Sequence, residues 1–203
     1  MFKGLCYKNS KDFELYKEKK RFTYQEQDPI KLEEYRQKLA EIPIEKRYFL
    51  DECGINKTPI REFGYSSKNV KIQDKKTGKR HSNTTIISFC NKTTVDEKYR
   101  LVAPHYQKTP MNTEFFLEYL TTALPKIPVG SYLIMDNVAF HKSNKILDYI
   151  KEKGYFVLFL SAYSPQENPI EHLWFHLKYN ILKLASTCLN FYEKIIKTFE
   201  LIG

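Results

Sequence analysis

Long hydrophobic runs and paired cysteines are both missing from this sequence of 203 residues. No segment approaches the roughly 18 consecutive apolar residues of a membrane span, and the N-terminal MFKGLCYKNSKDFELYK has no apolar stretch of signal-peptide length. The cysteines form no C-x-x-C pair, which argues against a disulfide framework and a zinc knuckle; they are Cys6, Cys53, Cys90 and Cys188. We therefore expect a cytoplasmic protein in a reducing compartment, with no membrane partner.

Acidic residues are outnumbered by basic ones. The 33 Lys and Arg residues against 24 Asp and Glu residues give a formal net charge of +9, and basic side chains cluster in residues 17–21 (KEKKR) and 68–80 (KNVKIQDKKTGKR). Such clusters fit a polyanionic partner, although a solvated surface is the alternative. A hydrophobic content of 42% argues against disorder, and the length suits one sizeable domain.

The pattern of apolar residues changes near residue 45. Before it, Asp28-Pro29 opens a helical pattern that Pro43 ends. After it, residues 47–55, 84–91 and 99–103 predict three consecutive antiparallel strands. The chain then predicts alternating helices and strands: a helix from Asn112 to Pro125, a strand at 131–135, a helix from Ser143 to Gly154, an apolar central strand at 155–160, a helix from Asn168 and a terminal helix after 191. This order predicts an α/β fold with a mixed sheet and flanking helices.

The segment YSPQENPIEHLW joins a polar turn to a helix. Asn168 is a favourable N-cap, Pro169 suits the first helical position, and Glu171 has the spacing of a capping-box residue. The segment alone is explained by helix initiation. A functional role for Glu171 needs support from the rest of the chain.

Two other acids supply that support. Asp51 lies within the first predicted strand, where an ionised side chain needs a partner, and Asp136 follows the apolar strand SYLIM. Because ligands of open α/β sheets bind at strand ends, Asp51, Asp136 and Glu171 can converge on one edge. Each acid alone has a structural explanation, such as a turn, a lysine partner or a cap. Together, clustered carboxylates favour a Mg²⁺ or Mn²⁺ site, and two such ions suit phosphoryl transfer.

Two competing ligand sets are weaker. His172 and His176 have the four-residue spacing of zinc ligands, but the sequence has no His-Glu-x-x-His, and helical geometry turns both away from Glu171. Glu52 should face away from Asp51 on its strand, and Glu167 precedes the helix. We therefore expect neither glutamate to be a metal ligand.

Three segments resemble the catalytic blocks of the DDE transposases in the mariner superfamily, most closely its bacterial insertion-sequence branch of the six-thirty type. They are FLDECGI, LIMDNVAFHKS and LSAYSPQENPIEHLWFHLK, with Asp51, Asp136 and Glu171 at the positions of the three acids. The 34 residues between the second and third acids agree with that branch. The resemblance extends through REFGYSSKN and the basic segment to HYQKTPMNTEFFLEYL, and covers about residues 18–200.

The resemblance implies an RNase H-like fold and DNA cleavage and strand transfer at insertion-sequence ends, with Mg²⁺ or Mn²⁺ as the cofactor. Its implied partners are double-stranded DNA, with terminal inverted repeats and a TA target, and a second copy in a homodimer on the bacterial nucleoid. It gives catalytic and metal-binding roles to Asp51, Asp136 and Glu171. Supporting roles fall to Asn137, His141, Asn168 and Trp174, and DNA contacts to Lys68, Lys71, Lys75, Lys76, Lys79 and Arg80.

One departure from the family pattern concerns the N-terminus. Only about 45 residues precede the first block, where relatives carry two helix-turn-helix domains that bind the inverted repeats. We expect residues 1–44 to be the tail and linker of that region and 45–203 to be the catalytic domain. The chain is then either the second of two frames joined by frameshifting, with targeting from an upstream helix-turn-helix polypeptide, or a truncated remnant that only binds DNA non-specifically. A stand-alone RNase H-like nuclease is the remaining alternative.

Overall fold

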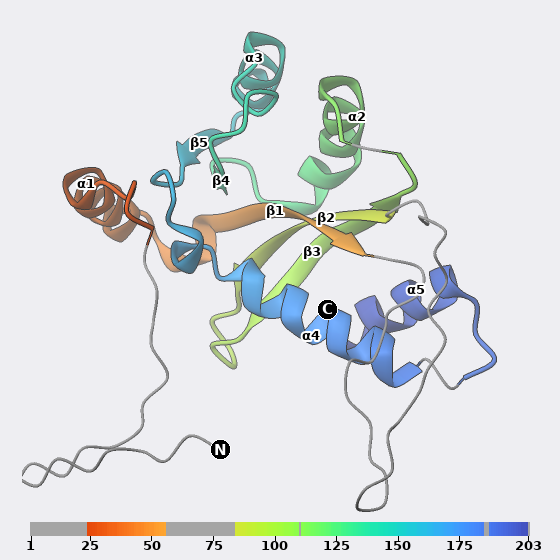
Figure 1. Cartoon of the computed structure of the whole chain (residues 1–203). Coiled ribbons are helices and arrows are strands. Elements are labelled where there is room, and N and C mark those ends of the chain that lie inside the picture. The colour runs from red at the N-terminus through yellow and green to blue at the C-terminus, as the bar shows by residue number, and fades with distance from the viewer. Residues whose placement is uncertain (1–23, 56–83, 110, 185–186, 203) are drawn as a thin grey trace, which may run out of the picture.

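A five-stranded sheet runs through the centre of the computed structural model, with helices on both faces (Figure 1). The structure describes residues 24–55, 84–109, 111–184 and 187–202. The strands are β1 (Arg47–Ile55), β2 (Thr84–Lys92), β3 (Tyr99–Gln107), β4 (Tyr132–Met135) and β5 (Phe156–Phe159). The α-helices are α1 (Pro29–Glu41), α2 (Thr113–Ala123), α3 (Asn144–Glu152), α4 (Ile170–Lys183) and α5 (Phe191–Ile202), with short 3-10 helices at Ile44–Lys46, Leu124–Lys126 and Pro165–Glu167.

The sheet is mixed, in the order β3-β2-β1-β4-β5. The first three strands pair antiparallel, as the sequence predicts, whereas β1 with β4 and β4 with β5 pair parallel. Parallel neighbours need crossover connections, which the helices between β3, β4 and β5 provide. The predicted α/β class with a mixed sheet is therefore confirmed.

One prediction about an individual element was wrong and another was confirmed. The segment 155–160 was expected to be a central strand covered on both faces, but β5 is at the edge of the sheet and Phe156 is half exposed. Pro125 was expected to close its helix, and α2 does end just before it, at Ala123, after which the chain continues as the 3-10 helix Leu124–Lys126. Proline fits this position because it lies in the first turn of the new helix, where no N–H donor is needed.

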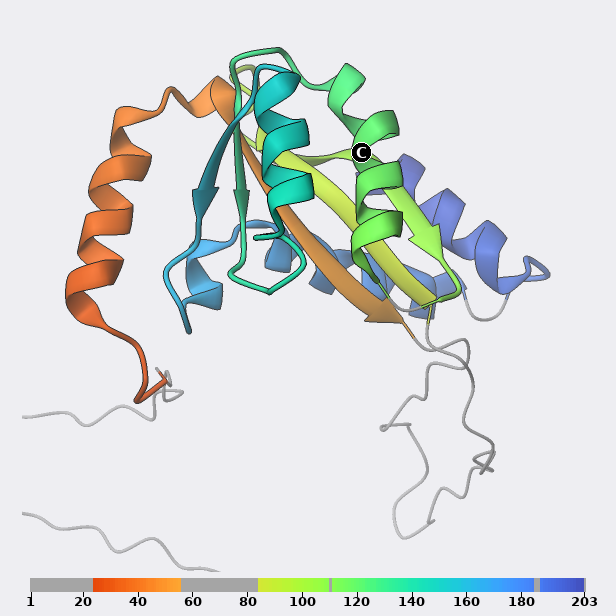
Figure 2. The same cartoon turned by 90° about the horizontal axis from the view of Figure 1, so that it is seen from above.

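The two faces of the sheet bury separate hydrophobic clusters. On one face, α2 and α3 cover side chains such as Leu50 and Leu133. On the other face, α4 and α5 cover Phe49 and Ile134, and α1 adds Leu32 and Tyr35 to the same cluster. Figure 2 shows α2 and α3 in front of the strands and α4 and α5 behind them. Because successive residues of a strand point to opposite faces, neighbours such as Phe49 and Leu50 belong to different layers.

Helix α1 begins where the sequence predicts. Asp28 caps it by accepting hydrogen bonds from the backbone N–H groups of Ile30 and Lys31. Helix α1 is connected to the segment before α4 by an ion pair between Arg36 and Glu167, with a nitrogen to oxygen distance of 2.6 Å. Within the described part of the chain, no helix is long and apolar enough to cross a membrane.

Adjacent isoleucines on α5 provide a test of this packing. Ile195 is fully buried against α4, whereas Ile196 is 47% exposed. We expect Ile195→Ala to lower the free energy of unfolding by about 2–5 kcal/mol, because the lost contacts leave a cavity. The matched control Ile196→Ala should change it by less than about 1 kcal/mol. Urea denaturation of the two variants measures the difference, and equal effects would contradict the docking of α5.

Candidate active site

The register of the sheet brings two acids to the same level. In the parallel pairing of β1 with β4, Phe49 lies opposite Ile134. The same offset carried two residues further places Asp51 beside Asp136, just past the end of β4. Phe49 and Ile134 both belong to the hydrophobic cluster under α4. Because side chains two residues apart on a strand point to the same face, Asp51 and Asp136 are expected on the α4 face as well.

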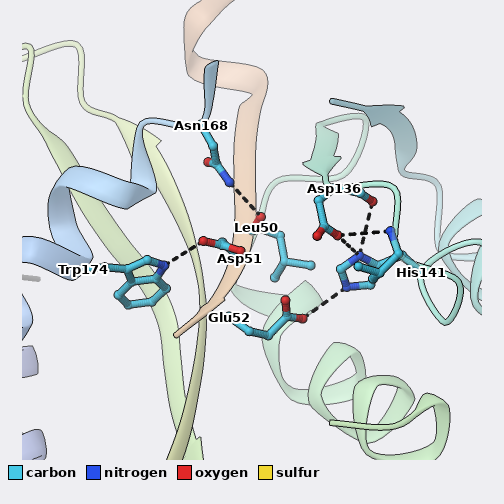
Figure 3. A network of polar contacts seen from close by, with 8 residues as sticks. Leu50, Asp51, Glu52, Asp136, His141, Asn168 and Trp174 are labelled. Atoms are coloured by element: carbon cyan, nitrogen blue, oxygen red, sulfur yellow. Dashed lines mark hydrogen bonds and ion pairs between the residues drawn. The ribbon is translucent and has the colours of Figure 1, made fainter. Parts of the chain in front are cut away.

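Asp51 is held under α4 by the single tryptophan of the chain. The Trp174 indole Nε1 donates a hydrogen bond to Asp51 Oδ2 over 3.0 Å (Figure 3). Burial, together with the negative charges of Glu52 and Glu171, outweighs the lowering effect of the Trp174 hydrogen bond and raises the pKa of Asp51 to about 7. The carboxyl group is therefore only partly ionised at neutral pH, and a cation in the pocket would favour its ionised form.

Glu171 comes to the site on the first turn of α4. The helix begins at Ile170, and Pro169 already has helical backbone angles, so the start lies within one residue of the predicted position. The predicted cap is wrong, however: α4 has no side-chain cap, and the Asn168 amide donates to the carbonyl of Leu50. Among the described residues, the Glu171 side chain makes no capping hydrogen bond, which leaves its carboxylate free for another role.

One pocket of about 690 Å³ is lined by Asp51, Asp136 and Glu171 together. Asn137 and Asn168 also line it, and the Asn137 amide donates to the carbonyl of Leu160 over 2.6 Å. The three acids that the sequence singled out therefore come from β1, the end of β4 and the start of α4 to one cavity. A pocket of this size is in the range of about 300–1,000 Å³ that holds small organic ligands.

Behind the pocket, a buried histidine joins two carboxylates. The His141 ring is fully buried; its Nδ1 lies 2.8 Å from Asp136 Oδ1 and its Nε2 lies 3.2 Å from Glu52 Oε1 (Figure 3). Burial lowers the pKa of His141, but the hydrogen bonds and charges of Asp136 and Glu52 outweigh it and raise the pKa to about 9. The ring is therefore an imidazolium at neutral pH and donates to both acids.

The sequence analysis gave His141 a supporting role but missed its contact with Glu52. Glu52 does point away from Asp51, as strand alternation predicts, yet it reaches Asp136 through His141 (Figure 3). The aromatic rings of Phe116 and Phe140 pack against His141, with centroids 4.6 and 4.4 Å from it. Only the pairing of an acid at a strand end with a histidine five residues later hints at this arrangement in the sequence.

The donor set fits a hard divalent cation, because its members are carboxylates around one pocket. In the side-chain positions of the structure, no three His, Cys, Asp or Glu residues of the described ranges are grouped closely enough to hold a metal ion. Asp51 and Asp136 are instead engaged by Trp174 and His141. Rotation of these carboxylates toward the pocket would be needed for ligation.

The remaining candidates are placed as follows. His172 and His176 are exposed on α4 and join no third ligand in the described part of the chain, which gives the zinc interpretation no support. Glu167 pairs with Arg36. The six basic candidates of residues 68–80 lie outside the described residues.

A sequence profile of the family described as DDE superfamily endonuclease matches residues 46–190. The chain belongs to this family. The match spans all three acids of the pocket. No curated protein sequence matches the chain.

Solved structures with a similar fold are chains of Mos1 transposase. In the paired-end complex with the left transposon end, the match covers 91% of this chain and 64% of that chain, with 14% identity and a TM-score of 0.59. In the paired-end complex with Mg, the match covers 91% of this chain and 64% of that chain, with 13% identity and a TM-score of 0.57. For the catalytic domain of Mos1 mariner transposase, the match covers 85% of this chain and 74% of that chain, with 17% identity and a TM-score of 0.51.

These matches establish an RNase H-like fold for this chain, as the sequence predicts. The chain spans about 64% of the length of the Mos1 transposase chain in the first of these complexes.

The raised pKa of Asp51 predicts a pH-dependent stability. Its ordinary value is 3.8 and its value in the folded chain is about 7, so the folded state loses stability from this group as the pH rises from about 4 to about 7. Asp51→Asn removes the charge and keeps an oxygen for Trp174. Without divalent metal, we expect it to raise the Tm by at least about 3 °C at pH 8 and by less at pH 5.

Thermal unfolding with a chelator present measures this effect. Asp148→Asn, at an exposed carboxylate on α3, is the matched control and should show no such difference between the two pH values. A gain for Asp51→Asn that is the same at pH 5 and pH 8 would contradict an unneutralised charge at this position.

Proposed function

We propose that this chain is the catalytic part of a DDE transposase of the mariner superfamily, from the bacterial insertion-sequence branch of the six-thirty type. Its reaction is divalent-metal-dependent DNA cleavage and strand transfer at insertion-sequence ends. The observation that carries the proposal is the pocket that Asp51, Asp136 and Glu171 line together, inside the segment that matches the endonuclease family.

In this proposal the three carboxylates hold Mg²⁺ or Mn²⁺, as two ions. When bound, such ions activate the attacking oxygen and stabilise the leaving oxygen of a phosphodiester. Trp174 positions Asp51 through its indole N–H, and His141 positions Asp136 while its charge reduces the repulsion among the acids. Asn137 and Asn168 fix the strand ends by donating to the carbonyls of Leu160 and Leu50.

The proposed partner is double-stranded DNA with terminal inverted repeats and a TA target, bound by a homodimer. One of the Mos1 structures is a paired-end complex with the left transposon end, which supports DNA as the partner. We propose that residues 45–203 are the catalytic domain and residues 1–44 a linker segment, in agreement with a family match that begins at residue 46. Sequence-specific recognition would then come from a helix-turn-helix polypeptide.

The first test replaces the acids singly. Asp51→Asn, Asp136→Asn and Glu171→Gln should each reduce nicking of duplex DNA in Mg²⁺ or Mn²⁺ to below about 1% of wild type, because each removes a ligand charge. Calcium, which is larger and more loosely coordinated, should permit DNA binding with little turnover. Glu114→Gln, at an exposed position on α2, is the matched control and should retain activity.

The same variants separate the alternatives. Calorimetric titration with Mn²⁺ should lose its binding signal in all three acid variants, independently of activity. Metal binding and nicking without joining of cut ends to a target would favour a stand-alone nuclease. DNA binding without any nicking by the wild type would favour an inactive remnant. Full activity in Glu171→Gln would remove that residue from the site.

The second test concerns the basic segment 68–80. If it follows the phosphate backbone, replacing Lys75 and Lys76 by Gln should reduce the slope of log K against log salt by about 1–2. The control pair Lys145→Gln and Lys151→Gln removes the same charge from exposed positions on α3. Fluorescence anisotropy at several salt concentrations measures both slopes, and an unchanged slope for the first pair would make the segment a solvated surface.

A further inference from the structure

Two exposed tyrosines stand together at the rim of the acidic pocket. The rings of Tyr24 and Tyr163 lie with their centroids 6.0 Å apart and their planes inclined by 42°. Both residues line the pocket, yet they are 56% and 54% exposed. Neither ring contributes to the two buried clusters, so core packing does not explain this pair.

Tyr163 has an unfavourable backbone conformation. Its φ of 56° lies in the left-handed region, which glycine adopts more easily than any bulky residue. The turn is held by Gln27, whose Nε2 donates to the carbonyl of Tyr163 over 3.1 Å and to Ser164 Oγ over 2.8 Å. A glycine would form the same turn with less strain, so the aromatic ring at this position points to a function at the pocket rim.

Two polar residues of the pocket lining have unused hydrogen-bonding capacity. Ser161 and Asn168 both line the pocket, and Asn168 is only 5% exposed. Ser161 Oγ and Asn168 Oδ1 are buried and have no hydrogen-bond partner among the described residues. Buried polar atoms without partners are rare in folded proteins and often mark a place for a ligand or a water molecule.

The pocket thus combines three kinds of surface. Its lining includes carboxylates, buried polar atoms without a partner among the described residues, and two aromatic rings. A nucleotide offers a matching group to each of these surfaces, because its phosphate and its base are joined through a polar sugar. A base that is still paired inside a duplex has both of its faces covered, so only an unpaired base can stack on a tyrosine.

We propose that Tyr24 and Tyr163 form a stacking platform for one unpaired base of the DNA, next to the phosphate that would be bound through the cations of the three acids. This proposal rests on the proposed function for the identity of the phosphate. The Gln27 hydrogen bonds hold Tyr163 in place, and Ser161 and Asn168 face the nucleotide between its base and its phosphate. The site therefore prefers DNA whose strands are already separated at the reacting position.

A binding experiment tests the platform without requiring cleavage. The probes are a blunt duplex and the same duplex with a three-nucleotide unpaired end that carries the fluorescent base 2-aminopurine, both in Ca²⁺. We expect the wild type to quench the 2-aminopurine and to prefer the unpaired probe. Tyr163→Gly should reduce that preference by about 10- to 100-fold, the range expected for loss of one stacked base, and Tyr24→Ala should also reduce it.

Three controls separate stacking from folding. Tyr163→Phe keeps a ring and should behave as wild type. Tyr163→Gly should have an equal or higher Tm, because it relieves the left-handed conformation. Phe156→Ala removes a 53% exposed ring that is also paired with a tyrosine, Tyr132, but at the opposite end of the strands, and should leave the preference unchanged.

Each outcome decides the proposal. Quenching and preference that persist in Tyr163→Gly, or that are missing in the wild type, would overturn the platform even if the protein cleaves DNA in Mg²⁺. Quenching that depends on Tyr163 would support it even if no cleavage occurs, in which case the proposed transposase activity alone would fall.

Discussion

The parallel pairing of β1 with β4 is the constraint on which the site depends. These two strands share only a short ladder, from Arg47 opposite Tyr132 to Phe49 opposite Ile134, but its register decides which side chains meet beyond it. A shift of one residue would turn Asp51 to the α2 face and send Glu52 to the pocket. The hydrophobic clusters prevent such a shift, because they require Phe49 on one face and Leu50 on the other.

The acids near this pair of strands are stabilised in two different ways, one on each face of the sheet. Asp51 faces α4, where Trp174 supplies one neutral donor, whereas Glu52 and Asp136 share the imidazolium of His141. Glu52 and Asp136 thus have a cation within the protein, the imidazolium of His141, whereas Asp51 has only the neutral indole of Trp174. This difference agrees with the raised pKa of Asp51, because a buried carboxyl group without a neighbouring cation is ionised less readily.

Much of this arrangement could be predicted from sequence because strong local signals coincide. Apolar strands and helix start signals predicted the order of the elements. Asp51 interrupts an apolar strand, Asp136 follows one, and Glu171 follows a helix start signal. The edge position of β5 could not be predicted, since an apolar run such as YFVLF has the same pattern in an edge strand as in a central one. The role of Asn168 was also out of reach, because its amide reaches Leu50, 118 positions away in sequence, and only the tertiary fold brings the two together.

The strand order has a consequence for how the protein gains its chemistry during synthesis. Strands β1, β2 and β3 pair with near neighbours in the chain, whereas the partner of β1 on its other side, β4, follows only after α2. Contacts between distant segments form late because closing long loops costs entropy. A growing chain can therefore fold its antiparallel half while it still lacks Asp136 and Glu171. The three acids meet only once α4 has left the ribosome, so the pocket that they line is completed late in synthesis.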